Sequence, residues 1–170
     1  MRLYLCPETD PRDRLTRLRE AASRFTGRDA SGWTRAEHPG GKPYFAEAPE
    51  LEFSVSHSGA WWACALGDAP LGLDIERTAP RPFLRLAERF FCPEEADWFR
   101  ARGGAADFYR IWCAKEAVLK RSGDGLAGGL RSFSVLSPLP DGAVLHYLPA
   151  PEGYTLCLCA ADSAPECEAL

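Results

Sequence analysis

Hydrophobic and polar positions form distinct local patterns along the 170 residues of this chain. Residues 3–6 form an apolar run that predicts a short strand. Leucine, alanine and phenylalanine then recur at helical spacing, which predicts a helix capped by Asp10, with Pro11 at its first position and Gly27 at its end. Residues 27–50 are rich in glycine and proline and predict a loop.

Three strand-like segments follow this loop. Apolar residues alternate with polar ones over residues 51–55, and residues 61–66 and 71–76 are further apolar runs. Turn-forming pairs, Ser58-Gly59 and Gly67-Asp68, separate the three segments. The pattern predicts a three-stranded meander.

The second half of the chain changes to helical spacing and then returns to strands. Proline and acids at a helix start, and glycines at helix ends, mark the boundaries. The expected elements are helices at 83–91, from Pro93 to about Arg102 and from Asp107 to Gly123, then strands at 132–136, 144–148 and 154–160 and a loose tail at 162–170.

This order of elements predicts an α+β fold made of two similar halves. Each half would be a small antiparallel sheet packed with helices, and a pseudo-two-fold would relate them. The expected halves are residues 1–76 and 77–170, which together form one compact unit.

Composition narrows the class of protein. Hydrophobic residues make up 46% of the chain, which is enough for a core, and the longest apolar runs are too short to span a membrane. Seven cysteines without a signal peptide indicate buried thiols in the cytoplasm rather than disulfides. The net charge of −4 disfavours a nucleic-acid-binding surface.

Charge is unevenly distributed. Residues 1–45 carry nine basic and six acidic side chains, a net of +3, which leaves −7 for the rest. A basic front suits an anionic ligand or partner, although a solvated helix face explains the same pattern.

Asp74 and Glu76 are the first candidate functional residues. They are two positions apart at the end of an apolar run, so a strand would point both carboxylates to one side. Such carboxylates repel unless a cation lies between them, and Mg²⁺ or Mn²⁺ prefers hard oxygen ligands. The alternative is a strand that emerges into solvent, with Arg77 as an ion-pair partner.

Lys115, Glu116 and Lys120 lie in the predicted helix that ends at Gly123. Glu116 and Lys120 are four positions apart and share one face. They form either an ordinary surface pair or a site in which Glu116 binds metal or accepts a proton, while the two lysines bind phosphate.

Residues 53–59 read Phe-Ser-Val-Ser-His-Ser-Gly. Neighbouring strand residues point to opposite sides, so Ser56 and His57 do not form a nucleophile–base pair. His57 and the nearby hydroxyls fit phosphate binding at a tight turn, and a polar hairpin tip is the alternative. Lys42 lies in a Gly-Gly-Lys-Pro turn that lacks the pattern of a P-loop.

These motifs together, in this order, resemble the 4′-phosphopantetheinyl transferases, specifically the longer pseudo-dimeric type that acts on carrier domains of peptide and polyketide synthases and on acyl carrier proteins. The resemblance implies a monomeric enzyme that transfers the phosphopantetheine arm of coenzyme A to a serine of an apo acyl or peptidyl carrier protein, with Mg²⁺ or Mn²⁺, releasing adenosine 3′,5′-bisphosphate. The segments that carry it are residues 41–43, 53–59, 71–76, 90–95 and 112–120.

The resemblance also implies roles for single residues. Asp74, Glu76 and Glu116 would bind the metal, and Glu116 or a nearby water would take the proton of the carrier serine. Lys120 would stabilise charge on the pyrophosphate. The other expected coenzyme A contacts are Lys42, Ser56, His57, Lys115, Arg12, Arg14 and Arg19.

Two other functions remain open at the level of the sequence. A degenerate relative would bind coenzyme A or a carrier protein without transfer. A metal-dependent nuclease also combines carboxylates with a lysine, but Arg77 and Thr78 follow Glu76 where that lysine would be expected.

Overall fold

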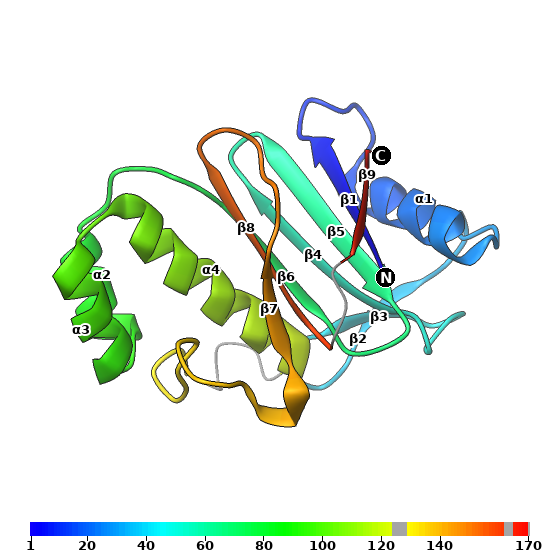
Figure 1. Ribbon diagram of the computed structural model, residues 1–170. Helices are drawn as coiled ribbons and strands as arrows, with labels where there is room; N and C mark the ends of the chain where they lie inside the picture. The colour runs from blue at the N-terminus through cyan, green and yellow to red at the C-terminus, as the bar shows by residue number, and fades with distance from the viewer. Residues whose placement is uncertain (124–128, 162–164, 170) are drawn as a thin grey trace.

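The computed structural model describes residues 1–123, 129–161 and 165–169 (Figure 1). Its helices and strands confirm the predicted α+β class. The helices are α1 (Arg14–Thr26), α2 (Phe83–Phe90), α3 (Pro93–Arg102) and α4 (Ala105–Ser122). The strands are β1 (Arg2–Pro7), β2 (Arg35–Glu37), β3 (Pro43–Phe45), β4 (Glu52–Ser58), β5 (Trp61–Gly67), β6 (Gly72–Arg77), β7 (Val144–Tyr147), β8 (Tyr154–Ala160) and β9 (Glu166–Ala169).

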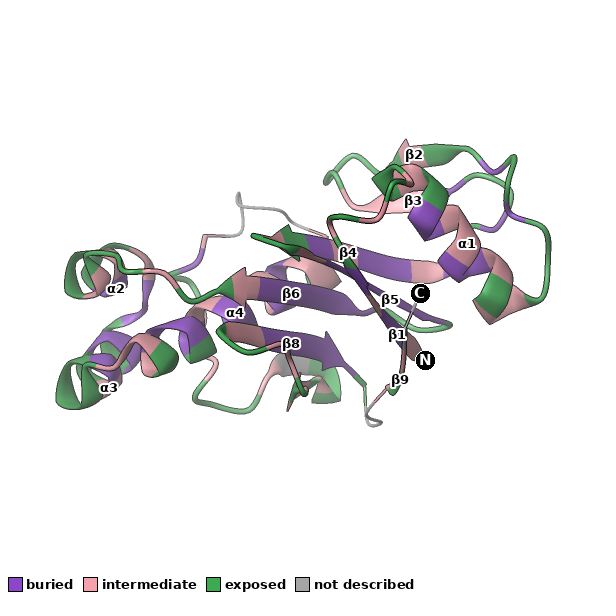
Figure 2. Cartoon of the chain, turned by 90° about the horizontal axis from the view of Figure 1, so that it is seen from above, coloured by how far each residue is buried: buried purple, intermediate pink, exposed green. Residues whose placement is uncertain are grey.

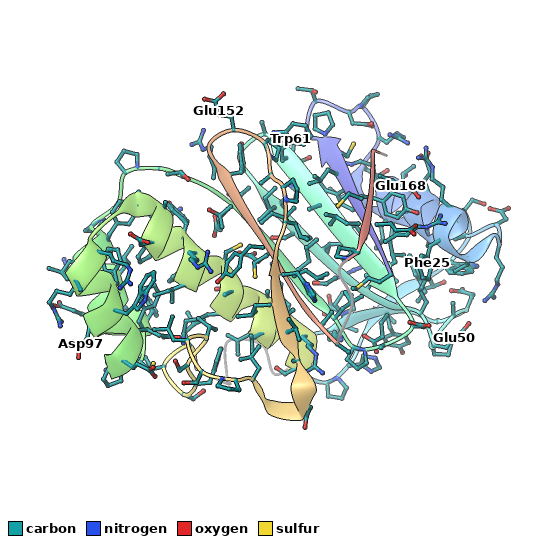
Figure 3. The ribbon with its side chains drawn as sticks, in the orientation of Figure 1. Phe25, Glu50, Trp61, Asp97, Glu152 and Glu168 are labelled. Carbon is teal, nitrogen blue, oxygen red and sulfur yellow. The ribbon has the colours of Figure 1, made fainter. Side chains whose placement is uncertain are left out.

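A four-stranded sheet and α1 form one side of the molecule. The strand order is β4-β5-β1-β9, in which β5 is antiparallel to both of its neighbours and β9 is parallel to β1. Side chains between α1 and this sheet form an apolar core that includes Tyr4, Leu18 and Trp62, and Phe25 packs against its edge (Figure 3).

A three-stranded antiparallel sheet, in the order β6-β8-β7, lies against α4 on the other side (Figure 1). Buried residues on its strands, such as Leu73 and Leu158, pack against the four-stranded sheet through Leu3 and Ala63. The opposite face packs on α4 through residues such as Cys157 and Ala117. This sheet is therefore covered on both faces.

Helices α2 and α3 lie at the far end of α4, away from the four-stranded sheet (Figure 1). An aromatic cluster joins the three helices, with Phe108 of α4 stacked on Phe91 at a centroid distance of 5.2 Å and on Trp112 at 5.7 Å. None of the described helices has the length and apolar character needed to span a membrane.

The start of α1 differs from the prediction. Asp13, not Asp10, caps the helix, because its carboxylate accepts from the backbone N–H groups of Leu15 and Thr16. Asp10 instead holds the side chain of Arg12. The end at Gly27 is confirmed, and this glycine has a φ of 70°, which suits a residue without a Cβ.

Three other elements differ from the predictions. The loop expected at 27–50 contains the β2–β3 ribbon. Residues 132–136 form bends rather than a strand. The tail expected to be loose contains β9, and Arg2 of β1 lies within ion-pair distance of Glu168. Local sequence did not indicate that β9 pairs with β1, since the two strands lie at opposite ends of the given sequence.

The expected meander is correct for β4 and β5 but wrong for β6, which pairs with β8 instead. A boundary after residue 76 would thus separate most of β6 from the strand to which it is hydrogen-bonded. The division into halves at 1–76 and 77–170 and the pseudo-two-fold between them stay predictions.

Candidate functional site

The site begins where α4 lies against β6. Gly72 permits this close approach, because a Cβ at this position would lie 2.1 Å from the carbonyl oxygen of Ala117. Gly72 lies two positions before Asp74, and Ala117 lies between Glu116 and Lys120. The glycine therefore lets the acidic strand and the charged helix meet.

Asp74 is buried and lies at the centre of the contact. Its Oδ1 accepts from the Ser56 hydroxyl at 2.8 Å and from Lys120 Nζ at 2.7 Å. Lys120 Nζ also donates to the Ser56 hydroxyl oxygen at 2.9 Å. Asp74 Oδ2 is buried and has no hydrogen-bond partner among the residues that the structure describes. An unpartnered buried carboxylate oxygen is costly and is a position that a cation would stabilise.

Glu76 and Glu116 complete the group of acids. Glu76 accepts from the Ser58 hydroxyl at 2.9 Å. Burial and then the charge of Asp74 raise the pKa of Glu76. Burial and then Asp74 also raise the pKa of Glu116, which Lys120 opposes. The Asp74 carboxylate thus lies close enough to Glu76 and Glu116 to disfavour their ionised forms.

The residues fit a divalent cation by chemistry, though not as a preformed cage. All three offer the hard oxygen donors that Mg²⁺ prefers, and Asp74 Oδ2 is available. In the described part of the chain, no three His, Cys, Asp or Glu side chains gather closely enough to hold a metal ion. Side-chain rotation, including movement of Lys120 away from Asp74, would be needed for the acids to converge on an ion.

A pocket of about 260 Å³ adjoins these acids. Lys42 forms part of its wall, and its Nζ contacts Glu52 Oε2 at 2.7 Å and the Arg121 carbonyl oxygen at 3.2 Å. The Lys42 turn lies directly on the end of α4, because a Cβ at Gly40 would be 2.2 Å from the Gly123 carbonyl. The lining residues are Arg35, Gly40, Gly41, Lys42, Pro43, Phe53, Ser54, Val55, Glu116, Leu119, Lys120 and Gly123.

His57 is exposed on the strand that carries Ser56. Burial of part of the ring lowers its pKa, and the positive charge of Arg14 lowers the pKa further. Arg14 therefore lies close enough to His57 for its charge to act on the ring. Arg14 itself pairs with Glu8 at 2.8 Å.

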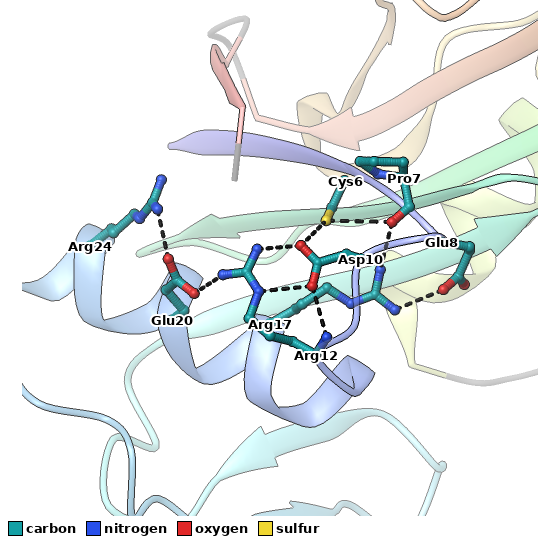
Figure 4. A network of polar contacts seen from close by, with 8 residues as sticks. All are labelled: Cys6, Pro7, Glu8, Asp10, Arg12, Arg17, Glu20 and Arg24. Carbon is teal, nitrogen blue, oxygen red and sulfur yellow. Dashed lines mark hydrogen bonds and ion pairs between the residues drawn. The ribbon is translucent and has the colours of Figure 1, made fainter.

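The other two candidate arginines have separate partners. The guanidinium of Arg12 contacts Asp10 and Glu20 in the network of Figure 4. Arg19 donates twice to the Trp33 carbonyl, at 2.9 and 2.7 Å. Neither contact involves the residues at the acidic site.

The side chain of Lys115 lies away from the acids, and its position does not support the expected role in coenzyme A binding. The side chain is fully buried, and its Nζ contacts Glu95 Oε1 at 2.8 Å, Glu95 Oε2 at 2.6 Å and the Phe133 carbonyl at 2.6 Å. These contacts use all three ammonium protons. Burial lowers the pKa of Lys115, while Glu95 opposes the shift.

The structure also reveals residues that the sequence predictions overlooked. Glu95, the partner of Lys115, was expected only as an acid in the first turn of a helix. Ser54 and Ser58 flank Ser56 at a spacing of two, and their hydroxyls face β6 in the same way. The alternation of the three serines is visible in the sequence, but their partner strand is not.

Comparisons with known proteins agree with these motifs. A model described as the 4′-phosphopantetheinyl transferase superfamily matches residues 70–162. A 4′-phosphopantetheinyl transferase of Bacillus subtilis is 36% identical over 158 residues, which cover 85% of this chain and 70% of the relative. The 4′-phosphopantetheinyl transferase Sfp of Bacillus subtilis (strain 168) is 37% identical over 135 residues, which cover 71% of this chain.

A third relative, the 4′-phosphopantetheinyl transferase psf-1 of Bacillus pumilus, is 40% identical over 97 residues and 55% of this chain. The matches span 60% of the length of Sfp and 41% of psf-1. The family match covers more than half of the chain and includes β6, α4 and the acids they carry. The chain therefore belongs to the 4′-phosphopantetheinyl transferase superfamily.

Proposed function

We propose that this protein transfers the 4′-phosphopantetheine arm of coenzyme A to a serine of an apo acyl or peptidyl carrier protein. The observation that carries the proposal is the contact of Ser56, Asp74 and Lys120, which come from β4, β6 and α4. Three motifs that are distant in sequence meet at one charged centre, beside a pocket that Lys42 and Glu116 line.

The residues divide into three proposed roles. Asp74, Glu76 and Glu116 would hold Mg²⁺, or Mn²⁺ in its place. Lys42 and His57 would contact the nucleotide end of coenzyme A, and Arg14 is the preferred arginine because it lies beside His57. Arg12 and Arg19 are weaker candidates because their contacts involve no residue of the site, and all three arginines would have to leave a present partner.

The reaction places two demands on these residues. The serine oxygen of the carrier forms a bond to the phosphorus next to the pantetheine arm, and the bond from that phosphorus to the bridging oxygen breaks. Adenosine 3′,5′-bisphosphate leaves with that oxygen. Glu116, or a water that it orients, would accept the serine proton, and Lys120 would stabilise the charge that develops on the leaving phosphate. A bound Mg²⁺ would supply further neutralisation of the pyrophosphate.

Helix α2 and the segment before it are the proposed docking region for the carrier protein. Leu84 is exposed at 49% and offers an apolar contact, whereas Phe83, Leu86 and Phe90 pack against the aromatic cluster. Arg81, Arg85 and Arg89 surround Leu84 in the sequence and are exposed or partly exposed. A basic surface of this kind complements an acidic carrier.

The two alternative functions are less well supported. The superfamily match contradicts a nuclease. A non-catalytic relative would lack part of the charged centre, whereas Asp74, Glu76, Glu116 and Lys120 are all present here. It would bind coenzyme A without releasing adenosine 3′,5′-bisphosphate.

The test incubates the protein with coenzyme A, Mg²⁺ and a panel of apo carrier proteins. Intact mass spectrometry would report a carrier that gains one phosphopantetheine arm, and chromatography would report the bisphosphate product. We expect Glu116→Ala to lower transfer roughly 10²- to 10⁴-fold, in the range that a general base contributes. Asp74→Ala should abolish transfer.

Circular dichroism should show that both variants remain folded. Glu152→Ala, in an exposed turn, serves as the control and should transfer normally. Near-normal transfer by Asp74→Ala and Glu116→Ala would contradict the proposed roles. Coenzyme A binding by the wild type without product release would instead favour the non-catalytic relative.

A further inference from the structure

Strands β4 and β6 lie side by side, yet each is hydrogen-bonded to another strand (Figure 2). The backbone of β4 pairs with β5, and the backbone of β6 pairs with β8. Within the described residues, no strand ladder joins β4 to β6. The two sheets therefore meet at a seam between two strand edges.

Serine hydroxyls bridge this seam at every second residue of β4. Ser54 Oγ accepts from the Leu73 N–H at 2.9 Å, Ser56 Oγ donates to Asp74 Oδ1, and Ser58 Oγ donates to Glu76 Oε2. Alternate residues of a strand point to one side, so all three hydroxyls face β6. The contacts advance in the same direction along both strands.

The Ser58 hydroxyl forms two hydrogen bonds, one as a donor and one as an acceptor. Its hydroxyl oxygen accepts from the Arg77 N–H at 3.0 Å, and its single proton is donated to Glu76 at 2.9 Å. The Arg77 N–H of β6 thus orients the Ser58 hydroxyl, and this hydroxyl in turn holds Glu76 Oε2. A hydroxyl has one donor, so Ser58 restrains one carboxylate oxygen of Glu76, and the Trp112 side chain is a second hydrogen-bonding partner of this carboxylate.

We infer that Ser58 is a positioning residue for the cation site, which it supports by restraining the Glu76 carboxylate and so limiting the side-chain rotation needed before the acids converge on a divalent ion. The inference rests on the proposed function, because it concerns the same three acids. Partners that orient a ligating carboxylate commonly change metal affinity when they are removed. Ser58 itself would touch neither the ion nor the substrate.

Comparison with the neighbouring serines, Ser54 and Ser56, distinguishes the positioning role of Ser58 from a purely structural one. Ser56 also contacts Lys120, so its removal would disturb two charged groups at once. Ser54 bridges the same seam but contacts a backbone N–H rather than a carboxylate. Ser54→Ala and Ser58→Ala would each remove the serine partner of a backbone N–H of β6, whereas only Ser58→Ala would also remove a hydrogen bond to an acid of the site.

The experiment measures Mn²⁺ binding by the full chain with coenzyme A present, using the electron paramagnetic resonance signal of free Mn²⁺. Thermal unfolding and the Mg²⁺ dependence of transfer are measured in parallel. We expect Ser58→Ala to raise the Kd for Mn²⁺ roughly 10-fold or more. Ser58→Thr keeps the hydroxyl and should restore binding. Ser54→Ala should lower the midpoint of thermal unfolding; because Ser54 lines the pocket, its Kd for Mn²⁺ is also compared with that of the wild type without coenzyme A, where the two should agree.

The outcomes distinguish this inference from the function on which it rests. Wild-type Mn²⁺ affinity in Ser58→Ala, together with normal binding and transfer by the wild type, would overturn the role of Ser58 alone. An equal loss of affinity in Ser54→Ala would also overturn it, because the effect would then come from the seam as a whole. A wild type that neither binds Mn²⁺ nor transfers the arm would overturn both.

Discussion

Helix α4 contributes a lysine to each of two ion pairs, Lys115 with Glu95 and Lys120 with Asp74. The two pairs differ in how many of the carboxylate oxygens have hydrogen-bond partners. Lys115 and Glu95 are both fully buried, and the Glu95 oxygens also accept from the backbone N–H groups of Cys92 and Val135. Lys120 is 30% exposed, and one oxygen of Asp74 has no partner in the described part of the chain. The same charge chemistry therefore serves two purposes on one helix.

Both carboxylate oxygens of Glu95 have hydrogen-bond partners, and we call Lys115–Glu95 the closed pair. We call Lys120–Asp74 the open pair, because Asp74 Oδ2 has no partner among the described residues. Glu95 links α3, α4 and the segment around residues 133–135, so its contacts hold the fold. Asp74, Glu76 and Glu116 lie near one another with Lys120 as the nearby cation. An incomplete set of buried partners costs stability and is typical of a site that completes itself by binding a ligand.

The largest loss of stability is expected when the closed pair, Lys115–Glu95, is broken. Lys115→Met leaves the Glu95 carboxylate buried without its counter-ion, which should lower the free energy of unfolding by about 3–5 kcal/mol. Chemical denaturation monitored by circular dichroism would measure this loss. The double variant Lys115→Met with Glu95→Gln should recover part of the stability, because no unpaired charge remains. A single variant as stable as the wild type would refute the structural role of this pair.

A smaller loss is expected when the open pair is broken. Lys120→Met removes one of two donors to Asp74 Oδ1 and should lower the free energy of unfolding by about 1–3 kcal/mol without divalent cation. Added Mg²⁺ should restore more stability to Lys120→Met than to Lys115→Met, since only Lys120 contacts an acid of the proposed cation site. Thermal unfolding with and without Mg²⁺ provides the measurement, and equal responses of the two variants would contradict the comparison.

The smallest effect concerns pH. Burial and Asp74 raise the pKa of Glu116 above its ordinary value of 4.5, so the folded state holds this proton more tightly than the unfolded state does. The stability that this carboxyl contributes is present below pH 4.5 and is lost as the pH rises through the raised pKa. Without divalent cation, Glu116→Gln should therefore be more stable than the wild type at neutral pH.

This difference should shrink as the pH falls toward 4.5, and urea titrations across that range would measure it. Glu152→Gln, whose side chain lies in an exposed turn (Figure 3), should follow the wild type at every pH. A constant difference between Glu116→Gln and the wild type at all pH values would show that the substitution acts through packing rather than ionisation.

The fold and site were predictable where local pattern carried the information. The helices at 83–90 and 93–102 and the strands β5, β6 and β8 follow from spacing and end signals in short windows. Ser56, Asp74 and Lys120 were expected to act together, and their side chains do contact one another. The pairing of Lys115 with Glu95 was not predictable, because a helical pattern gives the direction of a side chain but not the acid that faces it.

The sequence by itself determined the α+β class and the motifs that identify the family, because strand alternation, helical spacing and motif order are properties of the chain. Only the tertiary structure decided which strands are neighbours: β6 with β8, β9 with β1, and β4 with β6 through serine hydroxyls. It also separated Lys115 from Glu116, although they adjoin in sequence. The physical reason is that pairing and burial depend on residues far apart along the chain, whose contacts form only when the whole core packs.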